Sequence, residues 1–467
     1  MQTSRLIARV SLVAAALLAV STLSACGGDT GPAGTPGAAG TGGGAASGAT
    51  IKVAYQKTSA FFQLDDLLNK AKTEYEAANQ GNTVQLVPIE AEEDQYYTKL
   101  ALMEGSPDTA PDVIYEDTFQ VRSDAAAGYL LPIDDYLAKW PDASQFSDNA
   151  KQAGAGDDGK IYGISMGSDT RGIYFNKKIF ATAGLPADWQ PKTWADVLDA
   201  ARAVKAKAPD VIPLNIYASK AAGEATTMQG FEMLLYGTDD QLLAPNSDKW
   251  LTGSPGFKDS LGFIHTVFSE KLGPSMDLAL DAQLGARVST ELLPKGKLAI
   301  AIDGSWVPGQ WLSGDNAWPQ WQDNIGLAKM PTQNGQAPGA TSMSGGWLLS
   351  VGATSKAPQA AFDFIATALN KENSLKYDTD NAQIAVRDDV ANDPAYTAAN
   401  PSFQFFSSLM AVTHFRPATP DYPQISQNIQ VACESVATGQ ATPEQAAKTY
   451  DEALVRIVGQ DKTQAAS

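Results

Sequence analysis

Histidine and cysteine are scarce in this chain, which has two of each among 467 residues. Zinc and copper sites in proteins are built mainly from these two residue types, so neither metal is expected here. Calcium or iron sites made of carboxylates stay open, although no EF-hand loop occurs. The nucleophile elbow, the P-loop and the dinucleotide fingerprint are also missing from the sequence. We therefore expect no cofactor and no catalytic site, and the sequence assigns no residue to a metal site.

Positive charge is also in short supply. Lysine and arginine total 34 against 52 acidic residues, which gives a formal net charge of −18 and a pI near 4.5. Binding to nucleic acid needs a basic surface, so nucleic acid is excluded as a partner. The length suffices for two or three domains with a large core, and 44% apolar with 18% charged residues is typical of a soluble globular protein.

A long apolar run occurs at the start of the chain. Arg5 and Arg9 flank the beginning of the stretch 10–23, which is too short for a comfortable permanent membrane helix. It ends in Leu-Ser-Ala-Cys followed by glycines, which resembles the lipobox of bacterial lipoproteins. The resemblance implies a lipoprotein signal peptide over 1–25, cleaved before a diacylated Cys26. The alternative is a plain secretory peptide that happens to contain Cys26.

The segment 26–50 is almost entirely glycine, alanine, serine, threonine and proline, so it is predicted to be a flexible tether. An acylated Cys26 leaves Cys433 without a disulfide partner, and the helical pattern around Cys433 predicts a small buried residue. The expected location is the extracellular face of the cell membrane, with contact to the membrane through the lipid anchor only.

From residue 51 onward the chain alternates between strand and helix patterns. Strands are predicted over 51–55, 84–89 and 111–117, and helices over 64–78 and 96–103. Such alternation favours an α/β fold with a mainly parallel sheet covered on both faces.

Residues 160–201 contain two short apolar strands joined by the polar bend Gly167-Ser168-Asp169. Asn176 is placed to cap the following helix, and Thr193 opens the next one. Farther along, a predicted strand over 297–302 ends in a turn that presents Trp306. The segment between 202 and 296 is expected to be largely helical.

The order of these blocks resembles that of extracellular solute-binding proteins of family 1. The resemblance is carried by IYFNKKIF…AGL…PKTWADVL in 160–201, PDVIYED…AAGYLLPIDDYL in 111–137, Gly-Ser-Trp at 304–306 and GGWLLSVG at 345–352. These proteins are receptor subunits of bacterial ABC importers, best known for sugars. The resemblance covers nearly the whole chain after residue 50.

The resemblance implies a clamshell of two lobes, like that of periplasmic binding proteins, with three crossings between the lobes. We assign 51–165 and 298–352 to the N-terminal lobe, and 166–297 and 353–467 to the C-terminal lobe. It also implies that the chain acts as a monomer that delivers its ligand to the transmembrane subunits of an ABC permease.

Aromatic residues in loop-like places and polar residues near the predicted crossings are the candidates for ligand binding. Sugars present apolar C–H faces rimmed by hydroxyls, so their sites combine flat aromatic rings with hydrogen-bonding side chains. Trp306 and Trp347 lead because turn and glycine contexts place them at the ends of elements; core packing is the alternative for each aromatic. The full candidate set is Trp306, Trp347, Asp169, Arg171, Asp117, Glu116, Phe61, Tyr55, Glu224, Asp303 and Arg416.

The predicted function is a lipid-anchored substrate-binding subunit of an ABC importer, which captures a mono- or oligosaccharide and performs no bond chemistry. One alternative is a receptor of the same fold for a peptide, polyamine or metal, which a strongly charged cleft would favour. The other is a surface glycosidase or lyase. Adjacent acidic residues such as Glu116 and Asp117 do not support it, because neighbours on a strand face opposite sides.

Overall fold

The structure is a computed structural model that describes residues 48–58, 61–245 and 247–466. The predicted signal peptide, Cys26 and the tether up to residue 47 lie outside the described residues. Among the residues that the structure describes, no helix has the length and apolar character needed to span a bilayer.

The first lobe is built on a five-stranded sheet. Its strand order is β2 (Thr83–Glu90), β1 (Thr50–Lys57), β3 (Val113–Asp117), β11 (Trp347–Val351) and β4 (Gly163–Ser165). Helices α1 (Gln63–Ala78), α2 (Glu93–Glu104) and α14 (Pro358–Ala368) contribute apolar side chains to its core. β1 pairs in parallel with β2 and β3, whereas β11 runs antiparallel to both of its neighbours.

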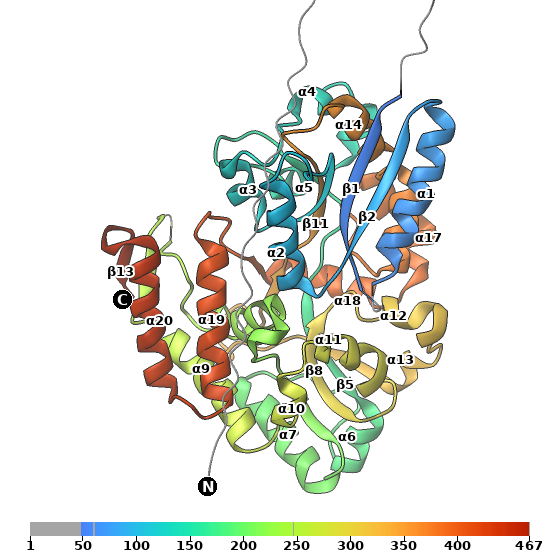
Figure 1. The fold of residues 1–467 in the computed structure, drawn as a ribbon. Helices are drawn as coiled ribbons and strands as arrows, with labels where there is room; N and C mark the ends of the chain where they lie inside the picture. Colours follow the sequence, from blue (N-terminus) through green and yellow to red (C-terminus); the bar gives the residue numbers. More distant parts are fainter. Residues whose placement is uncertain (1–47, 59–60, 246, 467) are drawn as a thin grey trace, which may run out of the picture. The chain divides into compact units, whose positions relative to one another are not determined.

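The second lobe is built on a four-stranded sheet with the order β6 (Ile212–Asn215), β8 (Leu298–Gly304), β5 (Arg171–Asn176) and β9 (Ile325–Ala328). Its largest core draws on α6 (Lys177–Ala183), α7 (Trp194–Lys207), α9 (Pro255–Ser269), α19 (Tyr422–Ala437) and α20 (Pro443–Val458). Figure 1 shows α9, α19 and α20 side by side at one edge of this lobe.

The chain also contains shorter α-helices, π-helical turns and strands. They are α3 (Val121–Ala127), α4 (Asp134–Leu137), α5 (Asp148–Ala153), a π-helical turn (Thr226–Glu232), α8 (Met233–Leu235), β7 (Trp250–Thr252), α10 (Met276–Ala279), α11 (Leu284–Arg287), a second π-helical turn (Val288–Leu292), α12 (Gly309–Leu312), α13 (Trp321–Asn324), β10 (Ser342–Ser344), α15 (Lys371–Asp380), α16 (Asp388–Ala391), α17 (Pro394–Ala399), α18 (Phe403–Ser408), β12 (Thr413–Phe415) and β13 (Thr463–Ala465).

Local sequence signals account for several of these boundaries. The Asn176 side chain accepts hydrogen bonds from the backbone amides of Lys178 and Ile179 at the start of α6. Thr193 and Asp196 form a reciprocal capping box at the start of α7. The side chains of Asn176 and Thr193 thus accept hydrogen bonds from backbone amides that have no partner within the first helical turn, which fixes where each helix starts. The predicted caps are therefore confirmed.

In the described part of the chain, the backbone passes between the two lobes three times. The crossings lie between β4 and β5, between β9 and β11, and between α14 and α19. β10 and β12 belong to the second and third crossings and pair in parallel with each other. Strands β5 and β11 each follow a crossing and each runs against the other strands of its sheet. The α/β clamshell fold is confirmed, with one reversed strand in each sheet.

The predicted lobe boundaries are wrong at two places. Strands β8 and β9, within the segment 298–352 assigned to the N-terminal lobe, pair with β5 and β6 in the sheet of the second lobe. Helix α14, assigned to the C-terminal lobe, packs in the core of the first. The expectation of a largely helical segment over 202–296 also misses β6 and β7. Strand partners far apart in sequence decide these memberships, and local patterns do not encode them.

Candidate functional site

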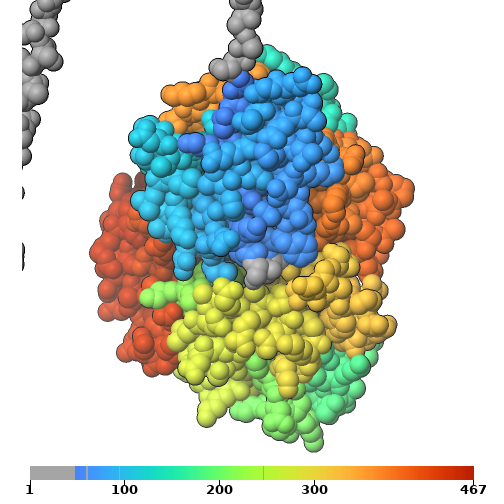
Figure 2. Space-filling model, turned by 45° about the vertical axis from the view of Figure 1, so that its right-hand side comes forward, coloured from blue at the N-terminus to red at the C-terminus, as the bar shows by residue number. Residues whose placement is uncertain are grey.

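A cavity of about 360 Å³ lies between the lobes and is lined by residues from both. In Figure 2 the blue segments of the first lobe face the green and yellow segments of the second. Strands β3 and β8 reach this region with their carboxyl ends, whereas the reversed strands β11 and β5 begin there. Their pairing places Trp347 opposite Asp117 and Arg171 opposite Gly304. The two sheet registers thus bring these side chains to the cavity.

Trp347 belongs to an aromatic cluster on the side of the first lobe. Its ring is parallel to that of Tyr115, with an interplanar angle of 1° and 4.3 Å between centroids. Tyr97 stacks at a longer distance of 5.9 Å. Trp347 is only partly buried and lines the cavity, so the cluster fixes the ring while leaving part of it accessible.

Trp306 lies two residues beyond the end of β8, on the side of the second lobe. Its ring folds back over Gly304, where an added Cβ would come within 2.0 Å of the ring, so the tryptophan requires glycine at that position. The guanidinium of Arg171 lies over the ring at 4.7 Å from its centroid. Part of the Trp306 surface is therefore covered by a cation, and the residue lines the cavity beside it.

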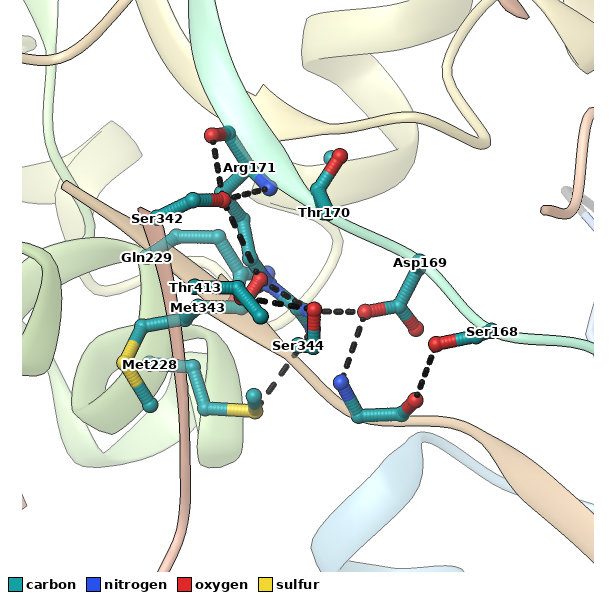
Figure 3. A network of polar contacts seen from close by, with 12 residues as sticks. Ser168, Asp169, Thr170, Arg171, Met228, Gln229, Ser342, Met343, Ser344 and Thr413 are labelled. Carbon is teal, nitrogen blue, oxygen red and sulfur yellow. Dashed lines mark hydrogen bonds and ion pairs between the residues drawn. The ribbon is translucent and has the colours of Figure 1, made fainter. Parts of the chain in front are cut away.

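Asp169 and Arg171 form an ion pair at the first crossing, shown in Figure 3. Asp169 also accepts a hydrogen bond of 2.9 Å from the amide of Gly345 at the second crossing. Arg171 donates to the Gln229 side chain at 3.3 Å and to the carbonyl of Met343 at 3.2 Å. Its guanidinium is thus committed to the protein, and the pair ties two crossings together.

Arg416 forms the second buried ion-pair centre, after β12. It donates to Asp117 of the first lobe at 2.5 Å and to Glu224 of the second at 3.1 Å. Burial raises the pKa of the Glu224 carboxyl, while Arg416 and a hydrogen bond from Ser426 act in the opposite direction. This centre links the two lobes beside the cavity.

Two further carboxyls line the cavity and have raised pKa values. Burial, reinforced by Asp117 and Glu224, raises the pKa of Glu93 to about 8. Burial also raises the pKa of Asp303 to about 6, although a hydrogen bond from the Tyr217 hydroxyl opposes this. The Tyr97 hydroxyl lies 2.9 Å from oxygens of both Glu93 and Asp117. Since one hydroxyl proton serves only one acceptor, a protonated Glu93 completes this chain of hydrogen bonds at neutral pH.

The structure brings most of the predicted site residues together. Those that line the cavity are Trp306, Trp347, Asp169, Arg171, Asp117, Phe61, Glu224, Asp303 and Arg416. Glu116 and Tyr55 do not line it. Successive residues of a strand point to opposite faces, and Glu116 therefore points away where Asp117 points in. Tyr55 is buried and donates its hydroxyl proton to Asp65.

Several lining residues escaped sequence analysis, among them Tyr115, Tyr217, Glu93, Gln229 and Asn381. A usable signal existed for Tyr115, because it lies two residues before Asp117 on the same strand and so shares its face. Tyr217 follows β6, a strand that was not predicted. Glu93, Gln229 and Asn381 come from helices or loops whose place beside the cavity depends on how the lobes pack.

The cavity combines aromatic surface with fixed hydrogen-bonding groups. Its lining includes six acidic residues against three basic ones, and each of the basic residues has a carboxylate partner. Such a lining suits a polar, uncharged ligand with apolar faces.

Outside the cavity, Glu104, Glu116 and Asp124 hold carboxylate oxygens within 4.8 Å of one another, a spacing at which residues can hold a metal ion.

Comparison with known proteins gives matches over most of the chain. Residues 63–374 match the sequence profile of the family described as bacterial extracellular solute-binding protein. The galactooligosaccharide-binding protein of Bacillus subtilis is 24% identical over 369 residues, which cover 77% of this chain and 79% of that protein. The sn-glycerol-3-phosphate-binding periplasmic protein of Brucella abortus is 25% identical over 222 residues, or 46% of this chain and 47% of that one.

Solved structures give a similar result for the fold. A solute-binding protein of an ABC transporter from Thermotoga lettingae, bound with α-D-tagatose, superposes with a TM-score of 0.75 at 24% identity. The superposition covers 88% of this chain and all of that one.

Proposed function

The chain belongs to the family of bacterial extracellular solute-binding proteins, and from this membership and the cavity lining we propose that it captures a short saccharide for an ABC importer. The observation that carries the proposal is the cavity between the lobes, where Trp347 and Trp306 offer ring surface beside fixed hydrogen-bonding groups. A volume of about 360 Å³ is at the small end of the range for small-molecule sites, roughly 300–1,000 Å³. This favours a mono- or disaccharide over a long oligosaccharide.

Charge supports an uncharged ligand. Arg171 and Arg416 are both buried and paired with carboxylates, and Lys220 lies 3.8 Å from Glu434. An anionic solute such as a phosphate ester would have to compete with these pairs. sn-Glycerol-3-phosphate, after which the Brucella relative is named, therefore does not suit this cavity, whereas a galactooligosaccharide or a ketohexose does.

A second candidate is a solute that carries an amino group. Asp303 lines the cavity without an ion-pair partner in the described part of the chain, so a cation placed between the lobes would be attracted to its carboxylate. Binding assays that include both neutral and amino sugars distinguish the two candidates.

We propose that Cys26 is diacylated, that the tether over 26–50 holds the folded part near the membrane, and that the monomer delivers its ligand to a permease without bond chemistry. Labelling with a fatty-acid analogue should mark the wild type and not Cys26→Ser. Labelling of Cys26→Ser would contradict acylation at this position.

The test of the main proposal is a thermal-shift and calorimetric screen of mono- and disaccharides. A ligand at one hundred times its dissociation constant stabilises the folded state by about 2.7 kcal/mol, so a true ligand should raise the melting temperature clearly. Stabilisation by sugars and not by sugar phosphates is the expected result. A screen in which phosphate esters bind and sugars do not would overturn the proposal, and release of cleaved oligosaccharide would point to an enzyme.

A further inference from the structure

Glu116, which does not reach the cavity, lies instead in a buried cluster of carboxyl groups in the first lobe. Its neighbours there are Glu104, the last residue of α2, and Asp124 of α3. One carboxyl oxygen from each of the three side chains lies within 4.8 Å of the other two. Glu116 has no exposed surface and Glu104 is 6% exposed. Three separate elements thus converge on one point through acidic side chains.

The side chains of this cluster have no compensating charge in the described residues. Neither carboxylate oxygen of Glu116 has a hydrogen-bond partner, and the same holds for one oxygen of Glu104. Arg122, which lies two residues before Asp124, pairs with Asp157 at 3.0 Å. Burying a carboxylate without a donor or a cation beside it is costly, and the nearest polar group to Glu116 is another carboxyl, that of Asp124, so the arrangement favours a bound cation.

We propose that Glu104, Glu116 and Asp124 bind one divalent cation, with calcium as the best fit. Calcium is held by oxygen ligands at about 2.3–2.6 Å, so two ligand atoms on opposite sides of the ion are about 4.6–5.2 Å apart and adjacent ones are closer. The spacing of up to 4.8 Å in the cluster meets this condition. Magnesium needs a tighter octahedron, and zinc prefers nitrogen and sulfur ligands.

The position gives the ion a structural role next to the ligand site. Glu116 immediately precedes Asp117, the β3 residue that pairs with Arg416. A bound cation would fasten the end of β3 to α2 and α3 without entering the cavity. Metal binding and sugar binding therefore concern separate groups, and each can be measured without the other.

Calorimetric titration of CaCl₂ into chelator-treated protein is the first test. It should show one site per chain, and terbium luminescence that calcium quenches should confirm it. Glu116→Gln and Asp124→Asn should each weaken calcium binding at least about tenfold. Glu232→Gln is the matched control, since Glu232 is equally buried with one unpartnered oxygen but lies in the π-helical turn of the second lobe.

Three results would overturn the proposal. The first is no heat and no terbium signal with wild type at millimolar metal. The burial of the cluster would then be explained by carboxyl groups that share protons, without a cation. The second is unchanged calcium binding in both cluster variants, and the third is equal weakening in Glu232→Gln. If Glu116→Gln does not fold, Asp124→Asn and the calcium content of the wild type after equilibrium dialysis decide the question.

Discussion

The guanidinium of Arg416 lies 2.5 Å from a carboxylate oxygen of Asp117, and this ion pair joins the chain after β12 to the last residue of β3. The same guanidinium contacts Glu224 at 3.1 Å and covers the ring of Phe119 at 4.2 Å. Arg416 is 7% exposed, and both carboxylates are also buried. Each of the three charged groups is removed from water, so its burial is tolerated only while its partners are present.

Removing Arg416 should therefore destabilise the protein strongly. Arg416→Met leaves two buried carboxylates without a cation, which typically costs about 3–5 kcal/mol. Arg202→Met is the control: Arg202 also contacts two carboxylates, Asp199 and Glu270, but is solvent-exposed. Exposed pairs contribute up to about 1 kcal/mol. Urea unfolding of both variants measures the difference, and equal losses would refute the assignment of a buried charge centre.

The two cavity tryptophans should be needed for affinity. Trp306→Ala and Trp347→Ala each remove ring surface from the cavity, and loss of such a residue costs roughly 2–4 kcal/mol of binding. That corresponds to a dissociation constant weaker by about 30-fold to 1000-fold. Calorimetry with the saccharide identified in the screen measures it.

Trp194→Ala is the control for these variants, because Trp194 is buried in the core of the second lobe and does not line the cavity. It should lose about 3–5 kcal/mol of fold stability and keep its sugar affinity. Unchanged affinity in a folded Trp306→Ala protein would remove that residue from the site.

Local signals predicted much of this fold because they act within a few residues. Asn176 and Thr193 cap helices through bonds to their own next turns, and the glycine before Trp306 permits the ring to fold back. The fold class followed from such elements in their order. Which sheet a strand joins did not follow, since Ile173 pairs with Ile302 across more than a hundred residues.

The limit is similar for the site. The sequence marked the end of β3 as important but not which face of the strand meets the cavity, so Glu116 and Asp117 were both predicted. The fold places Asp117 beside Arg416 and Glu116 in the carboxyl cluster. Glu93 belongs to the site through its proximity to Tyr97 and Asp117, and its raised pKa arises from burial that only the packed lobes create.

The raised pKa of Glu93 predicts a pH dependence of stability. Its value rises from 4.5 to about 8, chiefly through burial. Between these two values the folded protein keeps a proton that the unfolded chain releases, so this contribution to stability falls as pH rises towards 8. Glu93→Gln carries no such proton, and its stability relative to wild type should increase from pH 5.5 to 8.5.

Urea unfolding at several pH values measures this, and Glu444→Gln is the control. The pKa of Glu444 is lowered by its backbone hydrogen bond at the start of α20, so its contribution is lost only as pH falls below the usual carboxyl range. The difference between that variant and wild type should stay constant from pH 5.5 to 8.5. A constant difference for Glu93→Gln as well would contradict the assignment of a protonated Glu93.

Gly346 should tolerate no side chain, because two crossings meet at this point. Its φ is +150°, and an added Cβ would lie 2.7 Å from the carbonyl oxygen of Gly167. Gly346→Ala must push the first and second crossings apart or strain the backbone, which we expect to cost roughly 1–3 kcal/mol.

Gly262 of α9 is the control. It has no atom within 4 Å of its would-be Cβ, so Gly262→Ala should instead stabilise the protein by about 0.4–1 kcal/mol. Opposite signs in urea unfolding are the expected outcome. A neutral Gly346→Ala would show that the crossings can move apart freely, and that their close approach does not hold the lobes in place.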